Sequence, residues 1–223
     1  MNWKQLISAK RFGMEEFHEE RQENRSEFQR DYDRLIFSAP FRRLQNKTQV
    51  FPLPGSVFVH NRLTHSLEVA SVGRSLGDDV AKALLERHPE LQDSFLPEIG
   101  SIVSAACLAH DLGNPPFGHS GEKAISTFFS EGKGVRLKEK QPNGEQLSPM
   151  EWEDLTHFEG NANAFRILTH QFEGRRKGGF VLTYTTLASI VKYPFSSSLA
   201  GTKSKFGFFV SEEESFQKIA TEL

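Results

Sequence analysis

Two stretches of helical periodicity, separated by a turn rich in glycine and proline, constrain the fold of this chain most. In 61–87 the periodic positions are His65, Val69, Val72, Leu76, Val80 and Ala83. In 98–112 they are Ile99, Val103, Ala106 and His110. Gly113 then supplies a helix stop, and two prolines follow it. The pattern predicts two packed helices, each with a histidine on its apolar face, and a third helix that starts near Ser120.

Further helices are predicted towards the C-terminal end. The segment SPME at 148–151 has the form of a capping box, with Pro149 at the first helical position. Residues 156–172 are helical by composition, and 182–194 predict a helix that Pro194 ends. Together these segments predict an all-α fold.

The remaining segments predict surface structure. Residues 14–34 are densely charged and predict an exposed helix or arm, so 1–34 is taken as a charged N-terminal arm or helix. Residues 130–147 are charged and contain glycine, which is typical of a surface excursion. Prolines and a glycine between short apolar runs predict a loop, with a minor β-hairpin near 50–60.

Composition excludes several classes of protein. The formal net charge is −2, so no whole-chain field favours nucleic acid or an anionic membrane. The single cysteine, Cys107, cannot form an intrachain disulfide, which suits a reducing cytoplasm. Neither a signal peptide nor a membrane-spanning apolar run is evident, so we expect a cytoplasmic protein without a membrane partner.

The dipeptide His110-Asp111 is the first candidate for chemistry. It lies at a predicted helix C-terminus, where exposed carbonyls and the helix dipole favour a cation. Imidazole nitrogen with carboxylate oxygen suits manganese, iron, zinc and other first-row metals. A buried aspartate beside His65 and His110 would be costly without such a partner. The alternative is that each histidine is an ordinary core residue bonded to a backbone carbonyl.

His119 and Glu122 form a second candidate pair. Their i, i+3 spacing at a helix start places them side by side. A carboxylate next to an imidazole fixes its tautomer and raises its pKa, which suits proton transfer. Alternatively, Glu122 merely occupies a favourable first-turn position and His119 is solvated.

Three strings, HSLEV at 65–69, HDLGNPPFGHSGE at 110–122 and HFEGNANAFRIL at 157–168, resemble the deoxyguanosine triphosphate triphosphohydrolases of the HD-domain superfamily. FRRLQNKTQV, NRLTHS and LTYTTLASIVKYP fit the same family. The resemblance implies an HD-domain helical bundle with its core in 35–194. It implies that His65, His110 and Asp111 hold a divalent metal, Mn or Mg first, with Fe, Co, Ni or Zn as alternatives. It makes His119 the catalytic histidine, with Glu122 as its partner.

The resemblance also implies a deoxynucleoside triphosphate substrate, dGTP preferred, which is hydrolysed to deoxynucleoside and triphosphate. Gln49 would contact the deoxyribose, Arg62 the phosphates, and Asn114 would lie near the phosphates. Lys192 and Tyr193 are weaker candidates for the substrate pocket. The position of Arg62 also supports phosphate binding without the resemblance. It lies one helical turn before His65, where a guanidinium could hold a phosphate. A homo-oligomer is expected.

One departure from the family pattern concerns the fourth metal ligand, a distant aspartate. Asp154 is the only aspartate after Asp111, and its context does not match. We therefore expect 1–223 to be an incomplete HD domain, an N-terminal portion lacking the C-terminal part of the fold, with impaired activity. Two alternatives stay open. One is a phosphohydrolase of another nucleotide; the other is a non-catalytic module that binds nucleotide or single-stranded DNA through GRRKGG at 174–179 and FRRLQNK at 41–47.

Overall fold

The computed structural model describes residues 2–17, 25–47, 61–139, 145–174, 177–200 and 205–223. This part of the chain confirms the all-α fold, since it contains no β-strand; isolated bridges pair Arg11 with Thr183 and Ser196 with Phe208. Its α-helices are α1 (Trp3–Leu6), α2 (Glu27–Ile36), α3 (Ala39–Arg43), α4 (Arg62–Arg87), α5 (Ile99–Ala109), α6 (His119–Ser130), α7 (Pro149–Thr156), α8 (Gly160–Thr169), α9 (Tyr184–Ile190) and α10 (Glu213–Glu222). Short 3-10 turns lie at Glu15–Phe17, Leu44–Asn46, Pro89–Leu91, Leu96–Glu98, Lys133–Lys138, Ser197–Leu199 and Val210–Glu212. The β-hairpin expected near 50–60 lies outside the described residues.

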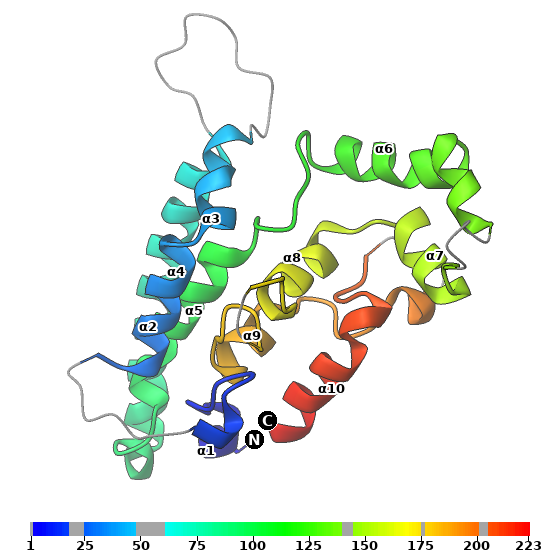
Figure 1. Cartoon of the computed structure of the whole chain (residues 1–223). Helices are drawn as coiled ribbons and strands as arrows, with labels where there is room; N and C mark the ends of the chain where they lie inside the picture. Colours follow the sequence, from blue (N-terminus) through cyan, green and yellow to red (C-terminus); the bar gives the residue numbers. More distant parts are fainter. Residues whose placement is uncertain (1, 18–24, 48–60, 140–144, 175–176, 201–204) are drawn as a thin grey trace, which may run out of the picture.

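The central helix of the bundle is α5. It packs most extensively along α4 and also contacts α2 and α9. Figure 1 shows α2, α4 and α5 side by side, with α8, α9 and α10 beyond them and the α6–α7 pair further out. The main core includes Leu35, Leu108, Phe165, Leu182 and Tyr184, each fully buried. Even α4, the longest helix described, is too polar to span a bilayer, and no other described helix has the length and hydropathy for it.

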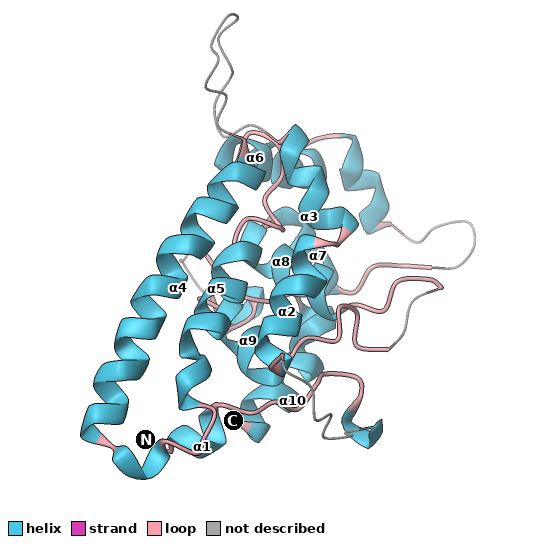
Figure 2. Cartoon of the chain, turned by 90° about the vertical axis from the view of Figure 1, so that its left-hand side faces the viewer, coloured by secondary structure: helices cyan, strands magenta, loops and turns pink. Residues whose placement is uncertain are grey.

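The face of α4 that packs on α5 differs from the expected apolar face. Its buried residues are mostly small: Arg62, Ser66, Ala70, Gly73, Gly77 and Ala81. Val72, Leu76 and Val80 are instead 60%, 61% and 50% exposed. Figure 2 shows α4 along an edge of the bundle. A Cβ at Gly77 would lie 2.8 Å from the Cα of Gly100, so glycine allows the two backbones to pack closely. The expected face was wrong because close packing buries the small residues.

Several helix boundaries agree with the sequence and others do not. The helix in 61–87 is confirmed, and so is the capping box, in which Ser148 and Glu151 exchange both hydrogen bonds. α5 ends at Ala109, before the expected 112, because the N–H of His110 turns to the carbonyl of Cys107. The segment 156–172 is not one helix: α7 ends at Thr156, and the side chain of Glu159 caps the separate α8.

Two further expectations need correction. α9 ends at Ile190, four residues before Pro194, and begins at Tyr184, after Thr183 caps it. α2 is not an exposed part of a charged arm, because Phe28 and Leu35 are fully buried. Asp31 on the same helix is also buried, and it accepts hydrogen bonds from Arg11 and Thr183. The expected surface excursion at 130–147 contains the mostly exposed 3-10 turn Lys133–Lys138.

Candidate metal centre

The three expected metal ligands lie together where α4 meets the end of α5. His65 lies in the first turn of α4, His110 is the C-cap residue of α5, and Asp111 follows it. One ligand atom from each lies within 4.8 Å of the other two. The two imidazole rings are 5.3 Å apart between centroids, at 70°. The three residues that the resemblance singled out thus form one cluster.

The donor set fits a divalent metal of the first transition row. His110 Nδ1 lies 2.6 Å from the carbonyl oxygen of Cys107. A carbonyl can only accept, so Nδ1 is the donor, and Nε2, 3.5 Å from Asp111 Oδ1, is the ring atom that could face a metal. A backbone carbonyl that orients a histidine in this way is typical of metal sites. Asp111 is 4% exposed and brings a negative charge, so the cluster combines two nitrogen donors with a buried carboxylate.

Asp111 is held by two neighbours. The guanidinium of Arg62 lies 2.9 Å from its Oδ2, and both side chains are buried. The amide nitrogen of Asn114 donates to its Oδ1 over 2.5 Å. The side chain of Asn114 therefore contacts the carboxylate of Asp111. Its expected place near the phosphates stays a prediction. Arg62 is close enough to the cluster to offset the charge of an anionic ligand.

Lys47 was not among the expected site residues. Its Nζ donates to the backbone oxygen of Asn114 over 2.9 Å, and the N–H of Arg62 donates to the carbonyl of Lys47. Burial lowers the pKa of the Lys47 ammonium, and the nearby charge of Arg62 lowers it further. The signal that could have found it is its place two residues before Gln49, within the string FRRLQNKTQV. Two cations thus flank Asp111.

A cavity of about 330 Å³ opens beside His110. Its lining comes from α5, α8 and α9 and the residues that follow α9: Val103, Ala106, Cys107, His110, Asn161, Ala164, Ser189, Ile190 and Lys192. The ammonium of Lys192 lies 5.5 Å from the centre of the Tyr193 ring. Lys192 therefore shares a cavity with His110, and Tyr193 is its neighbour.

His119 and Glu122 do not pair as expected. His119 is the first residue of α6 and is exposed. Glu122 Oε1 accepts the N–H of Gly160 over 2.9 Å, and Oε2 lies 3.4 Å from Lys205 Nζ. Among the described residues, His119 makes no hydrogen bond or ion pair with Glu122. Glu122 instead joins α6 to the start of α8, which the sequence did not indicate.

Gln49, Arg175 and Arg176 lie outside the described residues.

Asp154, the aspartate considered as a fourth ligand, lies on α7 and makes other contacts. Its two oxygens accept from Ser197 Oγ at 2.6 Å and from the N–H of Val210 at 2.8 Å. Asp154 therefore ties α7 to the C-terminal segment rather than to the cluster.

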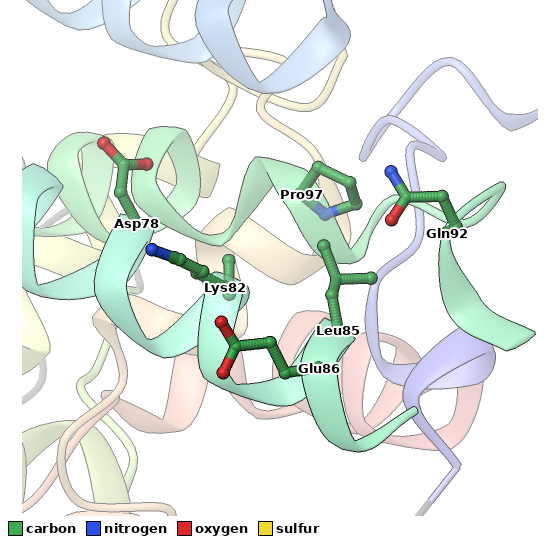
Figure 3. Close-up of a pocket in the computed structure, with 7 residues that line it drawn as sticks. Asp78, Lys82, Leu85, Glu86, Gln92 and Pro97 are labelled. Atoms are coloured by element: carbon green, nitrogen blue, oxygen red, sulfur yellow. The ribbon is translucent and has the colours of Figure 1, made fainter. Parts of the chain in front are cut away.

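A second hollow of about 450 Å³ lies at the other end of α4 (Figure 3). Asp78, Lys82 and Glu86 line it at successive turns of one helix, with Leu85 and Pro97 beside them. The three charged side chains are exposed, which is typical of a solvated helix face. We therefore assign the functional site to the cavity beside His110.

The fold and the cluster together define an all-helical protein with a candidate metal site of two histidines and an aspartate at a helix end. A family model described as "HD domain" matches residues 62–179, more than half of the chain. The chain belongs to the HD-domain family.

The chain is also similar to curated proteins of three organisms. The chain is 46% identical to "Deoxyguanosinetriphosphate triphosphohydrolase-like protein" of Synechocystis sp., over 99% of this chain and 51% of the relative. A protein of the same name from Pseudomonas aeruginosa is 46% identical, over 100% and 49%. "Deoxyguanosinetriphosphate triphosphohydrolase" of Yersinia enterocolitica is 36% identical, over 100% and 49%. The chain thus spans about half the length of the curated relatives it matches.

Proposed function

We propose that this chain carries the catalytic metal centre of a deoxynucleoside triphosphate triphosphohydrolase, with dGTP as the preferred substrate. In this reaction water attacks the α-phosphorus and the bond from phosphorus to the 5′-oxygen breaks. The 5′-oxygen takes up a proton, and the products are deoxynucleoside and inorganic triphosphate. The observation that carries the proposal is the meeting of His65, His110 and Asp111 beside two cations and a cavity.

His65, His110 and Asp111 would hold the metal, for which Mn²⁺ or Mg²⁺ is the first choice. The chemistry that such an ion supplies when bound is Lewis-acid stabilisation of negative charge at a phosphate. Arg62 and Lys47 would offset the charge of the triphosphate from the side of Asp111. Lys192 would bind the substrate from the far side of the cavity beside His110.

His119 would move the proton. It lies at the start of α6, at the end of the turn that leaves Asp111, and its exposed imidazole is free to meet a substrate. Its protonated form could give a proton to the leaving 5′-oxygen, and its neutral form could take one from water. Both assignments give the same products.

The test is incubation of the chain with dGTP and either Mn²⁺ or Mg²⁺, with phosphorus NMR and nucleoside chromatography as readouts. We expect triphosphate and deoxyguanosine in equal amounts, and neither with Asp111→Asn. The Yersinia relative, assayed beside it, gives the rate with which the turnover of this chain is compared. Release of pyrophosphate or single phosphate would contradict the proposal.

A panel of other nucleotides tests the main alternative, an HD phosphohydrolase with a different substrate. The non-catalytic reading depended partly on the basic segment 174–179, of which Arg175 and Arg176 are not described. Salt-dependent binding of single-stranded DNA without turnover would favour the non-catalytic alternative.

Light scattering on the same preparation tests the expected homo-oligomer.

A further inference from the structure

The turn from Asp111 to Glu122 is docked on the first residues of α8. The side-chain amide of Asn163 donates to the carbonyl of Gly113 over 2.8 Å. A Cβ at Gly113 would lie 2.0 Å from the carbonyl oxygen of Gly160 and 2.2 Å from the backbone nitrogen of Ala164. The two backbones therefore touch at this point, and the start of α8 fixes where the turn lies.

Gly160 lies between the two halves of the candidate site. A Cβ there would come within 2.1 Å of Asn114 Oδ1 and 2.9 Å of Glu122 Oε1. The same Asn114 side chain donates to Asp111, and the N–H of Gly160 donates to Glu122. Because Gly160 has no side chain, there is room for Asn114, which donates to Asp111. The N–H of Gly160 also holds Glu122, which anchors α6.

The other N–H groups at this helix start have their own partner. The carboxylate of Glu159 accepts from the N–H of Asn161 at 2.6 Å and of Ala162 at 3.2 Å. Glycine at a first helical position offers no helix propensity over alanine. The reason for glycine at 160 is therefore space, and the space is filled by Asn114.

We propose that Gly160 is a positioning residue of the metal centre. It acts on Asp111 through Asn114 and on α6 through Glu122. The inference rests on the metal centre proposed above, because Asp111 is one of its ligands. A methyl group at 160 would meet two movable side-chain ends, whereas a methyl group at 113 would meet backbone. Gly160→Ala should therefore disturb the site and leave the fold in place.

The first measurement is the affinity of the metal-free chain for MnCl₂, by calorimetry. Gly160→Ala and Asn114→Ala should each weaken binding about tenfold, the usual effect of losing a group that orients a metal ligand. The double variant should bind no more weakly than Asn114→Ala, because both changes break the same contact with Asp111. Lys82→Ala is the control, since that side chain is exposed on the part of α4 that lies far from the candidate site. Wild-type affinity for Gly160→Ala, or losses that add in the double variant, would overturn the proposal.

A second measurement does not need metal. In EDTA, Asn114→Ala should relieve the clash of Gly160→Ala, so the double variant should unfold at a higher urea concentration than Gly160→Ala alone. If Gly160→Ala does not fold, the double variant should fold. If the double variant did not unfold at a higher urea concentration than Gly160→Ala, the proposed role of Gly160 would be wrong, whether or not the chain binds metal. Failure of the wild-type chain to bind Mn²⁺, with relief still seen, would overturn the metal centre and leave the contact of Gly160 with Asn114 standing.

Discussion

Arg62 and Asp111 form an ion pair buried between α4 and the turn after α5, with Nη1 2.9 Å from Oδ2 and side chains 7% and 6% exposed. A buried carboxylate is costly without a compensating charge, so the guanidinium stabilises Asp111 in the metal-free chain. The same carboxylate is a proposed metal ligand. Arg62 and a bound metal would therefore share one partner.

Replacing Arg62 with glutamine should uncover this dependence. In EDTA, Arg62→Gln should lower the free energy of unfolding by about 3 kcal/mol, because it leaves a buried charge unpaired. Added Mn²⁺ should raise the stability of the variant more than that of the wild type, because the ion replaces the lost charge. Urea unfolding with EDTA and with MnCl₂ measures both effects. Arg25→Gln is the control, since its pair with Asp33 is exposed and should contribute less than about 1 kcal/mol. Equal stability of Arg62→Gln and wild type in EDTA would contradict the argument.

Substitutions of Glu122 separate anchoring from proton transfer. Glu122→Gln keeps a carbonyl oxygen for the N–H of Gly160 and loses only the charge that faces Lys205. If Glu122 acts as an anchor, triphosphate release by Glu122→Gln should stay within about fivefold of wild type. Glu122→Ala should lose about 10- to 100-fold, because α6 is no longer fixed to α8. Equal losses in both variants would mean that the negative charge is required, as in the expected pairing with His119.

Substitutions at two neighbouring positions on α4 should differ in their effect on the free energy of unfolding. Leu76 is 61% exposed, so Leu76→Lys should change the free energy of unfolding by less than about 0.5 kcal/mol. Gly77→Ala should lower it by about 1–3 kcal/mol, because the new Cβ would lie 2.8 Å from the Cα of Gly100. Urea unfolding of the two variants decides between the faces. If Leu76→Lys lowered the free energy of unfolding more than Gly77→Ala, the buried face of α4 would be the apolar face predicted from the sequence.

The sequence predicted the elements whose signal is local. The capping box at Ser148 and the helix from Arg62 depend on neighbouring residues alone, and both are confirmed. The resemblance to the HD-domain superfamily implied that His65, His110 and Asp111 belong to one site, and the structure brings the three together.

The predictions that were wrong concern residues whose surroundings depend on packing between segments far apart in the sequence. Periodicity on α4 marked the larger apolar residues, but Gly77 let α5 approach on another side. Glu122 was paired with His119 by their spacing along the helix, although its partner, Gly160, is 38 residues away. The burial of Asp31 depends on Arg11 and Thr183, which no local pattern joins to it.

The N-terminal segment should make stability depend on pH through Glu15. Its Oε1 accepts the hydroxyl of Tyr184 at 2.7 Å and the N–H of Gly13 at 3.0 Å, and lies 2.6 Å from Lys218 Nζ. Burial acts to raise the pKa of Glu15, but the hydrogen bonds from Lys218, Tyr184 and Gly13 outweigh it and lower that pKa to about 2. Because the folded pKa is below the unfolded value, this stabilisation is present above about pH 5 and is lost as the pH falls towards 2.

Glu15→Gln should remove this contribution. At pH 7 the variant should be less stable than wild type by about 1–2 kcal/mol, a value discounted for the solvent around Lys218. The difference should shrink as the pH falls from about 5 to 3, because wild-type Glu15 gives up its advantage in that range. Urea unfolding at several pH values measures it, with Glu131→Gln at an exposed position as the control. A stability difference that stays constant from pH 7 to pH 3 would show that Glu15 does not need its charge to join the N-terminal segment to α9 and α10.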